Sequence, residues 1–270
     1  MLGVEWGAAV AFTFWPIMGG ITRLIARPNH LVSPAVLGFG VIGPLFPITA
    51  AALATVTVPT TSDPTGWLVP VAGPVLGTLA LVFVVLANVT VTVIQLYLCG
   101  VGIQHVRAFT RLRWELLVAL FVAPGVRLAL RPEWVLDHVL VWVTYDGLIF
   151  AGIAAIMLVD FVLLRRRALD VRQLFNDAPS GAYGFWGGVN WAAVGVVVVS
   201  VWLYVRLYDP VTMASAAAFR YCGATLPTVL VSGLLYWLLV RLVVIPAGKG
   251  GYPRAAGAPA AAREDFVPAL

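Results

Sequence analysis

Long runs of apolar residues, separated by short polar segments, extend along almost the whole chain. A membrane-spanning helix needs about 20 predominantly apolar residues. Seven runs approach or exceed that length, at 4–25, 33–58, 67–104, 114–130, 134–164, 184–206 and 218–246. The pattern therefore predicts an all-α, polytopic membrane bundle with about seven transmembrane helices over residues 1–246. Residues 247–270, which are rich in Ala, Gly and Pro, are expected to form a disordered cytoplasmic tail.

The composition excludes several classes of protein. Hydrophobic residues make up 61% of the chain and charged residues 11%, against about 25% charged residues in an ordinary soluble domain. The formal charge of +5 comes from basic residues in loops, which indicates membrane topology and not nucleic-acid binding. No metal-ligand spacing or catalytic motif is present in the sequence, so we expect neither a metal nor a cofactor, and no enzymatic activity.

Arginines concentrate in every second loop. The loops after the first, third and fifth apolar runs carry, respectively, Arg23 and Arg27; Arg107, Arg111 and Arg113; and Arg165, Arg166, Arg167 and Arg172. By the positive-inside rule, these loops lie in the cytoplasm and the N-terminus lies outside. The expected location is the cytoplasmic membrane, with multiple passes.

One segment contains several polar positions at defined spacings. Asp160 lies near the end of the fifth run, three arginines follow at 165–167, and Gly187-Gly188-Val189-Asn190 lies near the start of the sixth run. We expect Asp160 to pair with an arginine about one turn away. We expect Asn190 to cap or interrupt the helix that follows.

This order of residues, D-F-x-L-x-R-R-R-x-L-D-x-x-x-L-F followed by G-x-Y and G-x-N-x-x-A, resembles the nucleobase:cation symporter-1 family. The resemblance implies secondary active transport of a nucleobase-like or related small heterocycle. It also implies a fold like the second inverted repeat, plus two extra helices, of the amino-acid/sodium symporter-like fold. The chain would then correspond to helices six to twelve, the C-terminal half of a permease, and a second membrane chain is a candidate to supply the missing first repeat.

The resemblance also indicates substrate-binding residues. Trp15, in the first run, is a candidate to stack on a flat substrate, although strict counting places Ala11 at the family's aromatic position. Asn88, Thr92 and Gln95 lie at i, i+4 and i+7, on one face of the third predicted helix. Two interpretations of that face stand side by side: substrate binding and hydrogen bonding between helices.

The expected coupling ion is a proton. The family's sodium-binding hydroxyls are replaced by Leu86 and Ala87, and Phe83 stands at a third position of that site. Leu and Ala side chains supply no oxygen ligand for a hard cation. Asp146, inside the fifth run, is a candidate proton carrier because an unpaired carboxylate is costly in a membrane. The alternative is that the span begins nearer Asp146 and leaves it in outer-facing water.

A second functional hypothesis belongs to another class. The chain would then be a truncated, non-transporting membrane protein, or a helical subunit that needs a partner chain. An adjacent reading frame encoding five further helices would discriminate between these possibilities.

Overall fold

The computed structural model describes residues 1–15, 35–42, 64–104, 111–170 and 183–252, with the isolated positions 33, 45, 49, 52, 109, 173 and 181. The helices in these ranges are α1 Leu2–Thr13, η1 Ala35–Ile42, α5 Pro64–Gln104, α6 Trp114–Ala129, α7 Pro132–Leu158, η3 Val159–Leu164, η4 Trp186–Gly188, α9 Trp191–Leu207, α10 Phe219–Cys222, α11 Thr225–Leu239 and η5 Val240–Val244. The described part of the chain contains no β-strand beyond one isolated bridge, Tyr208 to Ser215. The fold is therefore all-helical, as the sequence predicts.

The chain divides into two compact units. The first contains Met1–Pro16 and Leu136–Leu270, and the second contains Ile17–Val135. In the second unit, α5 breaks at Gly73, which has φ +79° and lies between Pro70 and Pro74. The chain turns back at Gly73 and brings Val69 close to Gly77. A Cβ at Gly77 would lie 2.6 Å from the Cα of Val69. A side chain at position 77 is therefore excluded by the folded-back segment.

Within the same unit, α6 packs against the C-terminal end of α5. The rings of Tyr97 and Trp114 have centroids 5.8 Å apart, and a Cβ at Gly100 would lie 2.7 Å from the Trp114 ring. Leu98 of α5 and Leu117 of α6 are both buried. The glycine lets the large indole approach the α5 backbone closely.

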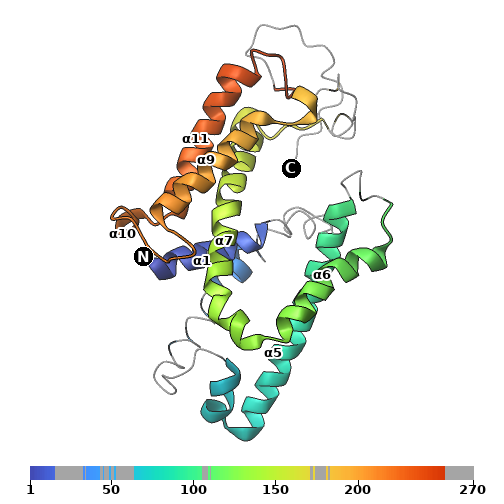
Figure 1. Cartoon of the computed structure of the whole chain (residues 1–270), viewed down its shortest axis with the longest axis vertical. Helices are drawn as coiled ribbons and strands as arrows, with labels where there is room; N and C mark the ends of the chain where they lie inside the picture. Colours follow the sequence, from blue (N-terminus) through green and yellow to red (C-terminus); the bar gives the residue numbers. More distant parts are fainter. Residues whose placement is uncertain are drawn as a thin grey trace. The chain divides into compact units, whose positions relative to one another are not determined.

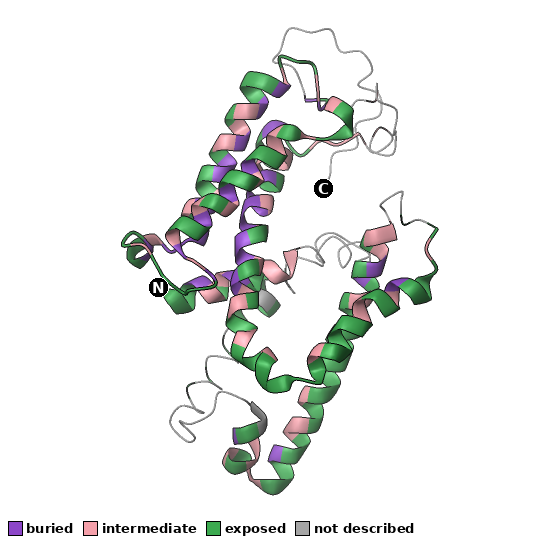
Figure 2. Cartoon of the chain, in the orientation of Figure 1, coloured by how far each residue is buried: buried purple, intermediate pink, exposed green. Residues whose placement is uncertain are grey.

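The first unit is built around α7, α9 and α11, which Figure 1 shows running together, with α1 lying across α7. The buried residues in Figure 2 concentrate where these three helices meet. Small residues permit the close approach. A Cβ at Gly152 would overlap the Ser200 side chain, and a Cβ at Gly147 would lie 2.9 Å from the Cβ of Ala9. Glycine and serine at helix contacts are typical of membrane bundles, in which packing drives association.

Three helices are long and apolar enough to cross a membrane: Gly66–Gln104, Pro132–Leu164 and Thr225–Val244. They correspond to the third, fifth and seventh predicted spans. The first and sixth predicted spans contain shorter apolar helices, Leu2–Thr13 and Trp191–Leu207. The fourth coincides with the 16-residue α6, and most of the second lies outside the described residues. The count of seven spans stays a prediction.

Candidate functional site

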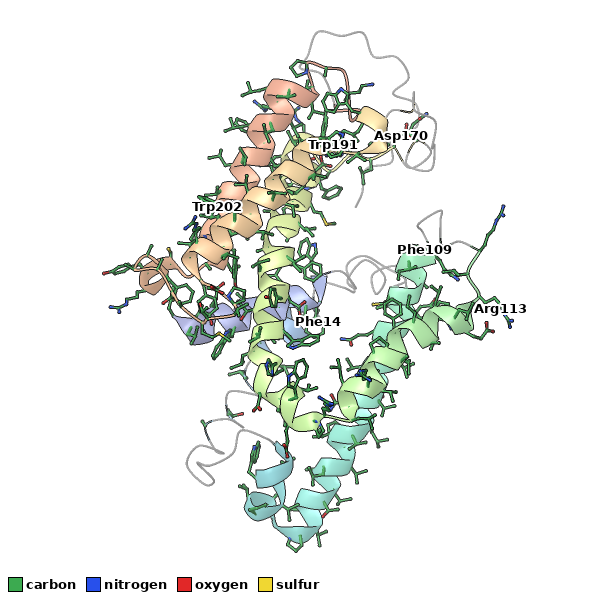
Figure 3. The ribbon with its side chains drawn as sticks, in the orientation of Figure 1. Phe14, Phe109, Arg113, Asp170, Trp191 and Trp202 are labelled. Carbon is green, nitrogen blue, oxygen red and sulfur yellow. The ribbon has the colours of Figure 1, made fainter. Side chains whose placement is uncertain are left out.

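Trp15, the predicted stacking residue, lies just beyond the end of α1 and against α7. Its indole Nε1 is 3.3 Å from the Sδ of Met157, to which it donates. Figure 3 labels the preceding residue, Phe14, near the point where α1 crosses α7. The rest of the pattern that the resemblance implies for this span, Gly19 to Arg23, lies outside the described residues. The indole is half-buried, so part of the ring is open to a partner.

Asp146 lies on α7, next to the point where α1 crosses it. It is half-buried, and among the described residues its carboxylate has no hydrogen-bond or ion-pair partner. The helix begins at Pro132, so Asp146 lies about 21 Å along the helix axis from that end. It is also about 16 Å along α7 from Met157, the residue that contacts Trp15. Trp15 and Asp146 therefore share a unit without direct contact.

The predicted polar face of α5 is present, and its donors bond to the helix itself. Asn88 donates to the Val84 carbonyl at 2.8 Å, and Thr92 donates to the Asn88 carbonyl at 2.8 Å. Both side chains and that of Gln95 are exposed. Bonding to the carbonyl four residues earlier satisfies a hydroxyl or amide donor in apolar surroundings. The acceptor oxygens of Asn88 and Thr92 stay available to a ligand or to another helix. These three residues belong to the second unit, so their role in a shared site stays a prediction.

The motif that begins at Asp160 forms a closed cluster at one end of the first unit. One carboxylate oxygen of Asp160 accepts from Arg165 Nε at 2.7 Å, and the other accepts from the hydroxyls of Tyr236 at 3.1 Å and Tyr252 at 2.6 Å. We call Asp160, Arg165, Tyr183, Tyr236 and Tyr252 the Asp160 cluster. The predicted pairing of Asp160 with an arginine is confirmed.

Arg165 is the buried centre of this cluster. Its Nη2 donates to the Gly250 carbonyl at 2.9 Å, and its guanidinium lies 4.6 Å from the ring centroid of Tyr183 and 4.5 Å from that of Tyr252. Burial lowers the pKa of the Arg165 guanidinium, but the hydrogen bond and charge of Asp160 outweigh it, so the pKa lies above its usual value. Burial and the hydrogen bond to Asp160 raise the pKa of the Tyr252 phenol, which remains a donor.

Asn190 connects this cluster to the start of α9. Its Oδ1 accepts from the Ala193 backbone N–H at 3.2 Å, and its Nδ2 donates to the Tyr236 hydroxyl at 3.0 Å. The predicted N-cap is therefore confirmed, and the same side chain also binds α11. Asp170 and Trp191, labelled in Figure 3, lie at this end of the unit. The motif thus ties the ends of α7, α9 and α11 together.

Glu5 forms a second cluster, which sequence reasoning missed. The side chain is buried, with 4% of its surface exposed. Its Oε1 accepts from the Tyr204 hydroxyl at 2.8 Å, the Thr225 backbone N–H at 2.9 Å and the Thr225 hydroxyl, and its Oε2 accepts from the Ala224 backbone N–H at 2.9 Å. We call Glu5, Tyr204, Ala224 and Thr225 the Glu5 cluster. The only sequence signal was one acidic residue in an otherwise apolar run.

Two curated proteins with significant sequence similarity to this chain are both named as permeases. A "Purine-uracil permease NCS1" of Arabidopsis thaliana is 25% identical over 109 residues, covering 38% of this chain and 18% of that protein. A "Hydantoin permease" of Microbacterium maritypicum is 39% identical over 49 residues, covering 18% of this chain and 10% of that protein. The matches thus span less than a fifth of each relative's length. No solved structure matches the chain significantly.

A family model matches most of the chain. It covers residues 4–235, from the first turn of α1 into α11, and includes the Asp160 motif and Glu5. Together with the three span-length apolar helices, this match identifies a membrane protein of the permease type. The chain belongs to the family of permeases for cytosine/purines, uracil, thiamine and allantoin.

Proposed function

We propose that this chain takes part in secondary active transport of a nucleobase-like or related small heterocycle across the cytoplasmic membrane. The match of the permease family model over residues 4–235 carries the proposal. The two relatives named for purine-uracil and hydantoin transport support a planar nitrogen heterocycle as the substrate class. In this proposal the protein is multi-pass, with the Arg165–Arg167 end in the cytoplasm.

The proposed binding residues have complementary chemistry. Trp15 offers a half-buried aromatic face for stacking. Asn88, Thr92 and Gln95 offer amide and hydroxyl groups that match the donors and acceptors on a heterocycle's edge. Asp146, half-buried and without a described partner, is the proposed proton carrier. The fold proposed for these residues is the second inverted repeat plus two helices.

The alternative proposal is a subunit or a non-transporting protein. As a subunit, the chain would need a second membrane chain to complete a substrate-binding site. In secondary transporters the substrate binds at the interface between two repeats, so one repeat alone supplies only part of the site.

Uptake by the purified chain tests both proposals. We expect that proteoliposomes containing only these 270 residues will not accumulate labelled cytosine, uracil, hypoxanthine, allantoin or hydantoin. Uptake is expected when a second membrane chain with the complementary helices is added. Uptake by the chain alone would overturn the need for a partner, whereas failure with every partner would support the non-transporting alternative.

Where uptake is obtained, we expect it to be independent of sodium. The side chains of Leu86 and Ala87 present no oxygen atom to the ion, and hard cations need several oxygen ligands. Replacing sodium with choline at fixed pH should leave the initial rate unchanged within about twofold. A saturable sodium requirement would contradict this expectation and would point to ligands elsewhere in the chain.

A further inference from the structure

The Glu5 carboxylate is surrounded by hydrogen-bond donors. Three donors reach Oε1 and one reaches Oε2, and they come from α9 and from the junction between α10 and α11. An ionised carboxylate only accepts hydrogen bonds, whereas a protonated one carries its own hydrogen. The cluster is therefore complementary to the ionised form of Glu5.

Among the described residues, no cation forms an ion pair with Glu5. Arg220 of α10 and the amino group of Met1, which precedes α1, belong to exposed residues. Two tyrosines interact electrostatically with Glu5: Tyr204 of α9 and Tyr208, the residue that follows this helix. From α7, Asp146 lies one residue from Gly147, which contacts α1 at Ala9. The backbone N–H groups at the start of α11 supply the compensating positive potential, as helix N-termini do for anions.

The absence of a side chain at Gly223, between α10 and α11, leaves room for the Glu5 carboxylate. Gly223 ends α10 with φ +67°, and a Cβ at this position would lie only 2.5 Å from the Glu5 Oε2. Residues with a side chain rarely adopt this backbone conformation. Glycine at this position therefore lets the carboxylate reach the Ala224 and Thr225 N–H groups.

We propose that Glu5 is a proton-operated latch that holds α1 against α9 and the start of α11. A proton on the carboxyl places its hydrogen against a neighbouring donor and removes an acceptor, which weakens the contact. Conversely, movement of α1 away from α11 strips the ionised carboxylate of its donors in apolar surroundings, which costs several kcal/mol unless a proton binds. Proton binding and release of α1 therefore favour each other.

The latch connects to the substrate because α1 leads to Trp15. Glu5 and Trp15 lie ten residues apart on the same helical segment, and Trp15 contacts α7 through Met157. Release at Glu5 shifts the helix that positions the proposed stacking residue. This step rests on the proposed function, and it makes Glu5 a positioning residue for proton-coupled transport. The latch itself is testable without any substrate.

Hydrogen–deuterium exchange of α1 tests the latch directly. The full chain in lipid nanodiscs is compared at pH 5 and pH 8, with the intrinsic exchange rate corrected. Wild-type peptides from Leu2–Thr13 should exchange faster at the lower pH, by up to about tenfold per pH unit, since one proton is linked to opening. Glu5→Gln should exchange rapidly at both pH values. The matched control, Glu133→Gln on the exposed first turn of α7, should behave like wild type.

A second variant guards against misfolding of Glu5→Gln. Tyr204→Phe keeps the carboxylate and removes one donor to its ionised form, so the midpoint of opening should move to higher pH. Equal α1 protection at both pH values in wild type, or full protection in Glu5→Gln, would overturn the latch. An unshifted midpoint in Tyr204→Phe would do the same.

Transport measurements separate the latch from the proposed function. In a preparation that supports uptake, Glu5→Gln should retain exchange of external for internal substrate and lose accumulation driven by a pH gradient. Unchanged accumulation would overturn the role of the latch in coupling. If no preparation supports uptake, the proposed function fails, and the exchange measurement on α1 still decides whether the latch exists.

Discussion

Replacing Arg165 with glutamine should lower the apparent melting temperature by about 5–10 °C, because it removes the charged centre of the Asp160 cluster. The side chain of Arg165 is 8% exposed and that of its partner Asp160 is 23% exposed. Removing one partner of such a pair leaves the other charge buried and uncompensated, at a cost of about 3–5 kcal/mol when fully buried. The partial exposure of Asp160 places the expected cost near the lower end. Thermal unfolding in detergent, followed by tryptophan fluorescence, measures the shift.

The neighbouring arginine supplies a matched control. Arg167 is exposed, so Arg167→Gln should change the melting temperature by no more than about 2 °C. Asp160→Asn should destabilise about as much as Arg165→Gln, and the double variant should lose less than the sum of the two. Equal effects at Arg165 and Arg167, or additive effects at Asp160 and Arg165, would contradict a buried, coupled pair.

The sequence predicted the parts of this cluster that depend on local spacing. Asp160 and Arg165 are five residues apart near one helix end, and Asn190 precedes an apolar run, so pairing and capping followed from local rules. Tyr183, Tyr236 and Tyr252 come from three separate segments, and a single sequence contains no signal that they converge. Tyr252 even lies in the range expected to be tail, whereas the packed structure extends to this residue, whose ring covers Arg165.

The helices were predictable for a similar reason. Hydropathy and length alone identify Gly66–Gln104, Pro132–Leu164 and Thr225–Val244 as helices long and apolar enough to cross a membrane. The third run, at 67–104, is longer than one bilayer crossing requires, and the helix it forms, α5, breaks at Gly73 between two prolines. Hydropathy does not specify which faces meet, so the crossing of α1 over α7 at Ala9 and Gly147 required the structure.

Glu5 shows where sequence reasoning failed. A single acidic residue at the start of an apolar run looks like a helix end in water, and its partners lie about 200 positions further along the chain. The structure buries it against those partners. Asp146, in contrast, was noticed because it lies deep inside a run, yet the described residues give it no partner. A search for acidic residues deep inside apolar runs therefore finds Asp146, which has no described partner, and misses Glu5, which is fully hydrogen-bonded.

Asp146→Asn should abolish proton-driven accumulation while leaving substrate exchange within about threefold of wild type. Asparagine keeps the size and polarity of the side chain but cannot carry a proton across the membrane. With one proton carried per substrate, each pH unit across the membrane contributes about 1.4 kcal/mol, or tenfold accumulation, and this gain should disappear. Accumulation and exchange of the same labelled substrate, measured in one proteoliposome preparation that supports uptake, provide both quantities.

The control for Asp146 lies on the same helix. Asp137 is exposed and about 14 Å nearer the start of α7, so Asp137→Asn should keep full accumulation. Full accumulation in Asp146→Asn would instead favour the alternative in which Asp146 faces outer water. The α1 exchange experiment separates Asp146 from Glu5. If Asp146 carries the proton and Glu5 holds α1, Asp146→Asn should lose accumulation and still show pH-dependent opening of α1, whereas Glu5→Gln should lose both.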